Sequence, residues 1–114
     1  MRSPLNGRII RDLRHERIAQ TQRWGEQHHP DGTGPTPENI AARDAAIAVC
    51  DGEHQAGFGT WRHIVDEELA EAYCEDQPIE LRAELVQVLA VVAAWIDDID
   101  SRLEGPEYEI TVTE

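Results

Sequence analysis

The sequence predicts an all-α protein with a four-helix bundle-like architecture. Apolar residues recur at helical spacing, Pro and Gly cluster in short loops between these segments, and good N-cap residues or Pro stand at the expected helix starts. The 114 residues fit one domain, with a helical core at about residues 8–103 and a short C-terminal extension at residues 104–114. Because a chain of this size buries only about two thirds of its surface on folding, we expect it to associate with a second copy.

Two helices are predicted in the first half of the chain. The first covers residues 6–24 and is followed by a loop at residues 25–35 that contains three Gly and two Pro. The second begins with Thr36 as N-cap and Pro37 at the first helical position, where the missing N–H costs nothing. We expect this helix to end near Cys50, before the next Gly.

Two further helices follow. One starts after Thr60 as N-cap, and the other starts at Pro78 and runs through Leu103. The turn between them is so short that these helices must lie side by side and antiparallel. Each of these two helices carries an apolar stripe. The stripes consist of Trp61, Ile64, Val65, Leu69, Ala72 and Tyr73 on the first, and of Leu81, Leu85, Val88, Leu89, Val92, Ile96 and Ile99 on the second.

Residues 108–112 alternate like a short strand, which fits either a dimer arm or a disordered end.

The charge is strongly negative, with 23 acidic residues against 10 basic ones and a net charge of -13. All ten basic residues are Arg, and six of them stand in the first 23 residues. Such a surface disfavours binding to nucleic-acid polymers and to anionic membranes. The sequence shows neither a secretory signal nor an apolar run of membrane-spanning length, so we expect a cytoplasmic protein whose two cysteines are reduced core residues.

One carboxylate falls on the apolar stripe of the third helix. Glu68 occupies a core-facing position, which is costly unless something compensates the charge, and Glu71 and Glu67 lie along the same flank. Glu84 borders the apolar face of the fourth helix, with Gln87 one turn further on. Two antiparallel helices would bring these carboxylates together, which is the ligand set that a hard divalent cation such as Mg²⁺ needs.

A simpler interpretation stays open for part of this acidic segment. Runs of Asp and Glu usually form solvated helix surface, and Glu is a good helix former. This interpretation suits Glu67, Glu75, Asp76 and Glu80 taken singly, whereas the core-edge positions of Glu68, Glu71 and Glu84 favour a metal site.

The segment Glu67-Glu68-Leu69-Ala70-Glu71 resembles the EExxE motif of MazG-like, all-α nucleoside triphosphate pyrophosphohydrolases. In that family an ExxD motif follows on the next helix, and this chain has Glu84-Leu85-Val86-Gln87 at a matching distance, with Gln87 in place of the Asp. The resemblance covers roughly Arg8 to Arg102.

The resemblance implies hydrolysis of a (d)NTP to a (d)NMP and pyrophosphate. We expect the protein to act as a homodimer or homotetramer. It implies that Glu67, Glu68, Glu71 and Glu84 hold Mg²⁺, with Mn²⁺ as an alternative, and that Gln87 coordinates weakly or orients a water. The metal would bridge the triphosphate and lower the pKa of the attacking water. Either Glu67 or Glu68 would instead accept the proton of that water.

The segment from Trp24 to Gly32 also resembles the end of the first helix and the following loop in small, phage-type members of this group. An exposed Trp24 would stack on a base, and His29 or Asp31 would hydrogen-bond its edge. Alternatively, Trp24 is a core anchor and the loop is only a turn. Three arginines suit either phosphate binding or pairing with surface carboxylates: Arg43, Arg62 and Arg82.

Three alternatives complete the predictions. A zinc site would have to use His28, His29, Cys50, His54 and Cys74, but these residues form no CxxC or HExxH motif, so it is disfavoured. A non-catalytic acidic helical protein that binds a basic partner would spread its carboxylates over exposed faces. A MazG-like scaffold without activity would be consistent with Gln87.

Overall fold

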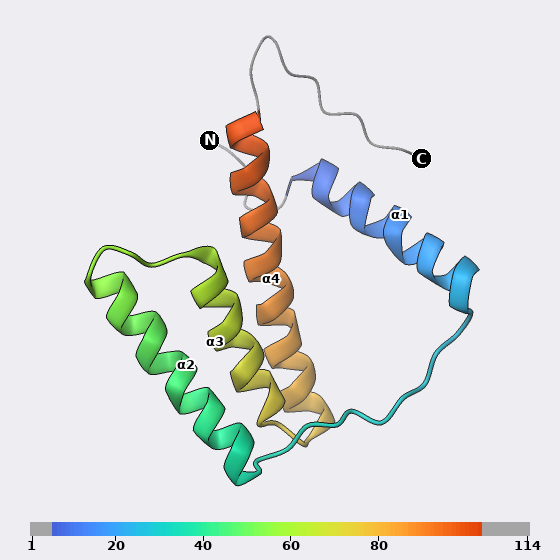
Figure 1. Ribbon diagram of the computed structural model, residues 1–114. Coiled ribbons are helices and arrows are strands. Elements are labelled where there is room, and N and C mark those ends of the chain that lie inside the picture. The colour runs from blue at the N-terminus through green and yellow to red at the C-terminus, as the bar shows by residue number, and fades with distance from the viewer. Residues whose placement is uncertain (1–5, 104–114) are drawn as a thin grey trace. The chain divides into compact units, whose positions relative to one another are not determined.

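The computed structural model describes residues 6–103, which contain four α-helices and no strand. The helices are α1 (Gly7–Trp24), α2 (Pro37–Gln55), α3 (Trp61–Tyr73) and α4 (Pro78–Leu103) (Figure 1). This confirms the predicted all-α class. The predicted extension at residues 104–114, with its strand-like residues 108–112, lies outside the described residues.

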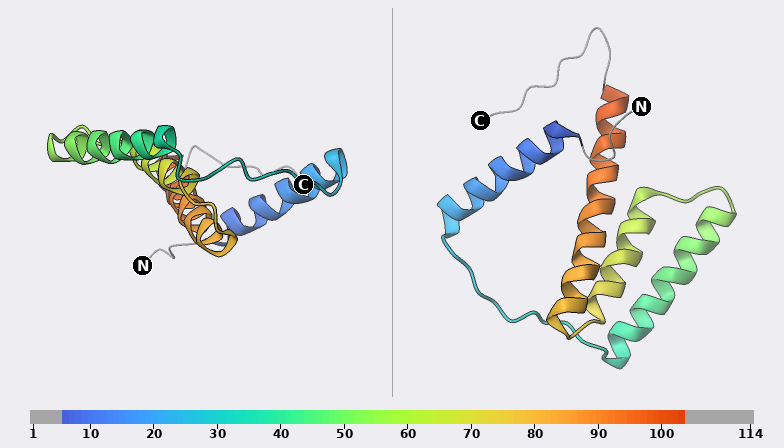
Figure 2. Two further views of the ribbon diagram at one scale, coloured as in Figure 1. Left: turned by 90° about the horizontal axis from the view of Figure 1, so that it is seen from below. Right: turned by 180° about the vertical axis from the view of Figure 1, so that it is seen from behind.

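The chain divides into two compact units, to both of which α4 contributes. One unit is Pro30–Val92, and the other is Met1–His29 together with Ala93–Glu114. In the Pro30–Val92 unit, α2 runs antiparallel to α3, and α3 runs antiparallel to the first half of α4 (Figures 1 and 2). The buried side chains of this unit are small apart from one Leu: Cys50, Ala72, Cys74 and Leu81.

The helix starts in this unit follow the predicted caps. The Thr36 hydroxyl accepts a hydrogen bond from the backbone N–H of Asn39 at 3.1 Å, and Pro37 is the first helical residue of α2. At α3, the Thr60 hydroxyl accepts from the backbone N–H of His63, whose Nδ1 accepts in return from the Thr60 N–H at 3.1 Å. Each such cap stabilises its helix by about 1 kcal/mol.

The end of α2 was predicted wrongly. The helix does not end near Cys50 but continues through Gly52 to Gln55. A hydrogen bond between the His54 imidazole Nδ1 and the Cys50 carbonyl oxygen, at 2.8 Å, spans this last turn. The helix ends just before Gly57, whose positive φ of 87° suits glycine.

The loop before α2 is fixed to the end of α3. The Gly34 N–H donates to the Tyr73 carbonyl at 2.9 Å, and the Asn39 side-chain amide donates to the same carbonyl at 3.1 Å. The Thr33 hydroxyl donates to the Glu75 carbonyl. These bonds satisfy carbonyl groups that the end of a helix leaves unpaired, and they set the position of the turn that leads into α4.

In the other unit, the Arg-rich α1 meets the acidic end of α4. The side-chain amide of Asn6, which caps α1, donates to Asp97 at 2.8 Å, and the Arg8 guanidinium lies 3.8 Å from the Asp100 carboxylate. Ile9 is buried in this unit. Part of the positive charge of α1 therefore balances acidic residues of the same chain.

Candidate metal centre

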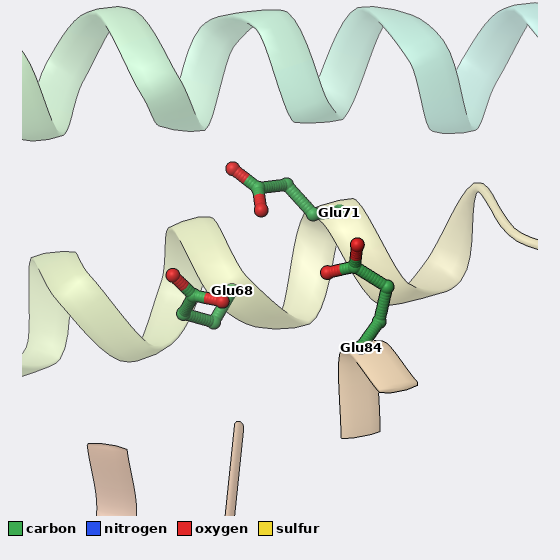
Figure 3. Close-up of side chains that lie close together, drawn as sticks. All are labelled: Glu68, Glu71 and Glu84. Atoms are coloured by element: carbon green, nitrogen blue, oxygen red, sulfur yellow. The ribbon is translucent and has the colours of Figure 1, made fainter. Parts of the chain in front are cut away.

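Three carboxylates from two helices converge in the Pro30–Val92 unit. Glu68 and Glu71 project from α3 and Glu84 projects from α4, and one oxygen of each lies within 4.8 Å of the others (Figure 3). Within residues 6–103, no other group of three His, Cys, Asp or Glu side chains comes this close together. The structure thus brings together three of the residues predicted from the sequence.

Local sequence explains this convergence. Glu68 and Glu71 are three residues apart, so they share one face of α3. Ala72, next to Glu71, is fully buried, which shows that this flank of α3 borders the interior. Because α4 returns antiparallel after a short turn at residues 74–77, its Glu84 stands opposite this flank.

Burial and neighbouring negative charges disfavour the ionised forms of Glu68 and Glu71. Burial raises the pKa of Glu68, and the negative charges of Glu67 and Glu84 raise it further. Burial also raises the pKa of Glu71, and the three neighbouring carboxylates add to the shift. Arg43 on α2 acts in the opposite direction on Glu71, so a positive charge lies beside the cluster.

Two oxygens of the cluster have no hydrogen-bond partner among residues 6–103. The Oε2 atoms of Glu68 and Glu84 are buried and accept no hydrogen bond from any residue that the structure describes. A buried polar atom in this condition costs on the order of 1–3 kcal/mol, and more when it is charged. Carboxylate oxygens are the ligands that Mg²⁺, Mn²⁺ and Ca²⁺ prefer. The cluster therefore fits a hard divalent cation, which would satisfy these oxygens and offset the repulsion.

Glu67 lies beside the cluster and acts on a residue of another helix. Burial of the Cys50 thiol on α2, together with the neighbouring Glu67 carboxylate and further acidic charges, raises the pKa of Cys50 to about 11. Cys50 is 5% exposed and remains a neutral thiol at pH 7. Both Cys50 and Cys74 are free and buried, which confirms their prediction as core residues. The contact between Cys50 and Glu67 was not predicted, because no spacing rule links residues on different helices.

The other predicted residues around the cluster lie at or near the surface. Gln87 is exposed on α4, one turn after Glu84. Arg43 is bound to Asp44 at 3.1 Å. Arg62 is exposed on α3, 3.9 Å from Asp66, which is the surface pairing considered as its alternative role.

The predicted base-binding residues fall in two places. Trp24 and His29 belong to the unit that contains α1. Trp24 is 57% exposed and carries the Arg23 guanidinium 4.9 Å from its ring centroid, so its alternative role as a core anchor is not observed. His29 lies 3.2 Å from the Gln27 side chain.

Asp31 belongs to the Pro30–Val92 unit but does not face the carboxylates. It lines a groove with Leu85 and neighbouring residues of α4. One residue along a helix turns by about 100°, so Leu85 and Glu84 occupy different sides of α4. The structure therefore separates Asp31 from Glu68, Glu71 and Glu84.

Comparison with known proteins adds no family assignment. No protein-family model matches the chain, and neither a curated protein nor a solved structure matches it significantly. Among the described helices, none combines the length and the apolar character that crossing a membrane requires.

Proposed function

We propose that this protein is a Mg²⁺-dependent nucleotide pyrophosphohydrolase that converts a (d)NTP and water into a (d)NMP and pyrophosphate. The observation that carries the proposal is the convergence of Glu68, Glu71 and Glu84, two of which have a buried oxygen without a donor among the described residues. The resemblance of the two acidic motifs to those of MazG-like enzymes supports this reaction class. We further propose that the protein acts on free nucleotides in the cytoplasm as a homodimer or homotetramer.

In this proposal, the three clustered carboxylates bind the cation. Glu68, Glu71 and Glu84 hold Mg²⁺, or Mn²⁺ in its place, and Gln87 offers a neutral oxygen where the related motif has Asp. When bound, the cation supplies the positive charge that lets an anionic triphosphate approach an acidic surface and polarises its phosphate. This requirement for a cation also reconciles the net charge of -13 with an anionic substrate.

The reaction itself needs a base and a means of orienting the triphosphate. The oxygen of a water molecule bonds to the α-phosphorus, the bond from that phosphorus to the α–β bridging oxygen breaks, and pyrophosphate leaves with the electron pair. Glu67 accepts the proton of the water, and the Cys50 thiol lies beside this carboxylate. Arg43, beside Glu71, contributes positive charge toward the phosphates.

The test is incubation with the eight common NTPs and dNTPs, in Mg²⁺ or in EDTA, with products identified by ³¹P NMR. We expect Mg²⁺-dependent release of pyrophosphate, not of orthophosphate, from at least one of them. Glu68→Gln and Glu71→Gln should lower the rate by about 100-fold or more, whereas Asp66→Asn, an exposed carboxylate of the same helix, should leave it unchanged. Folded protein that releases no pyrophosphate from any of the eight contradicts the proposal, and Mg²⁺ binding in that case would indicate a scaffold without activity.

A non-catalytic acidic protein that binds a basic partner is the less favoured function. Such a protein needs exposed carboxylates, whereas burial is the leading cause of the raised pKa values of Glu68 and Glu71. Its binding would also weaken steeply with salt.

A further inference from the structure

An apolar groove lies along the first half of α4, on a different side of the helix from Glu84. It has a volume of about 320 Å³. Three of its aliphatic side chains are about half exposed, at 46%, 48% and 49% for Leu85, Val86 and Leu89. Its lining also includes the buried Leu81 and two charged residues, Asp31 and Arg82.

Burial against a partner surface would stabilise these half-exposed aliphatic side chains. The sequence places Leu85 and Leu89 on the apolar stripe of the fourth helix, yet the Pro30–Val92 unit leaves both about half in solvent. Neighbouring exposed aliphatic side chains on one helix face mark a surface for association, because burying each of them stabilises a contact by about 1 kcal/mol.

The charges on the groove indicate what covers it. Asp31 and Arg82 line the same groove with opposite signs, and neither forms an ion pair within residues 6–103. In a two-fold dimer, residue i of one copy meets residue j of the other and the reverse contact occurs as well. A groove with one acid and one base is therefore complementary to itself. This matters because two chains of net charge -13 repel each other over most of their surfaces.

We propose that a second copy of this chain covers the groove in a two-fold dimer. Leu85, Val86 and Leu89 of the two copies pack across the axis, and Asp31 of each copy faces Arg82 of the other. This inference names the surface for the self-association proposed above, and it does not depend on the proposed hydrolysis.

Charge reversal tests the pairing directly, with the molar mass of the full chain measured by size exclusion with light scattering. Wild type should be a dimer or a higher multiple of two. Asp31→Arg alone places two Arg at each contact and Arg82→Asp alone places two Asp there, so each should weaken dimerisation by about 10–100-fold. The chain carrying both substitutions should dimerise again. So should an equimolar mixture of the two single variants, in which every contact pairs an Arg with an Asp.

The control is Arg62→Asp, which reverses an exposed Arg of α3 outside the groove and should leave the dimer intact. Circular dichroism should show the same helix content in all variants. A monomeric wild type, or dimers that neither single substitution weakens, would overturn the inference. Release of pyrophosphate by the wild-type sample, measured as above, reports on the proposed hydrolase separately, so failure of the dimer surface and failure of the proposed hydrolase are distinguished.

Discussion

Carboxyl oxygens of Glu68 on α3 and Glu84 on α4 lie within 4.8 Å of each other, and each residue keeps a buried Oε2 without a hydrogen-bond donor among the described residues. Two acids at this separation repel each other, and one oxygen of each is shielded from water. We therefore expect the arrangement to weaken the fold and to favour binding of a cation. Stability and metal binding should consequently change in opposite directions when these residues are altered.

Neutral replacements within the cluster should stabilise the metal-free protein. We expect Glu68→Gln or Glu71→Gln to raise the free energy of unfolding in EDTA by about 0.5 kcal/mol or more, because each removes like-charge repulsion while it preserves side-chain size. Urea denaturation followed by circular dichroism measures this change. Asp66→Asn is the matched control, since it removes an exposed negative charge from α3 outside the cluster. A loss of stability in both cluster variants, but not in the control, would contradict the electrostatic account.

The same residues predict an unusual dependence of stability on pH. The folded-state pKa values of Glu68 and Glu71 are raised above their values in the unfolded chain, which are about 4.3. Their contribution to stability is therefore fully present below the unfolded pKa and is lost as pH rises through the folded pKa. In EDTA, the stability advantage of the Glu68→Gln/Glu71→Gln variant over wild type should grow between pH 4 and pH 7. A difference that stays constant over this range would be inconsistent with the raised pKa values.

The two cysteines should resist alkylation in the folded protein. Cys50 is buried and has a pKa of about 11, so almost none of it is thiolate at pH 7.5, and Cys74 is 7% exposed. Mass spectrometry after iodoacetamide treatment should show neither residue labelled in native buffer and both labelled in 6 M guanidinium chloride. Labelling of Cys50 in folded protein at the rate of the denatured chain would show that the thiol is not held as described.

Replacement by alanine should change the free energy of unfolding in opposite directions at Gly59, which follows α2, and at Gly52, which lies inside it. A Cβ added at Gly59 would overlap the His54 imidazole ring, whose Nδ1 is bound to the Cys50 carbonyl. Gly59→Ala should therefore lower the free energy of unfolding by about 1–3 kcal/mol. Gly52 lies inside α2 with open space around it, so Gly52→Ala should raise the free energy of unfolding by up to about 1 kcal/mol.

A second substitution identifies the cause of the Gly59 effect. Combining Gly59→Ala with His54→Ala removes the ring that the added methyl group meets. The double variant should lose less stability than the two single losses added together. Additive losses would mean that the imidazole is not the obstacle.

The sequence predicts most elements because their signals are local. Thr36 and Thr60 cap helices with their own side chains, and Pro78 stands at a helix start, so no tertiary contact is needed to place them. The predicted end of α2 was wrong because we expected the helix to stop before Gly52. The helix accommodates this residue and continues to Gln55.

The carboxylate cluster was predictable for a related reason. The spacing of Glu68 and Glu71 fixes their common face, and a short turn fixes the antiparallel direction of α4, which brings Glu84 opposite them. The contact of Glu67 with Cys50 depends on how α2 is rotated about its own axis, which no local pattern reports. The position of Asp31 could not be predicted from the sequence either. It depends on hydrogen bonds from Thr33 and Gly34 of the same loop to carbonyl groups at the end of α3.

Isothermal titration of the metal-free protein with Mg²⁺ tests the central claim, that the three carboxylates form a divalent-cation site. We expect saturable binding by wild type and by Asp66→Asn, and binding weakened by at least about 10-fold in Glu68→Gln, Glu71→Gln and Glu84→Gln. The absence of binding in wild type, or equal affinity in wild type and all three cluster variants, would contradict it.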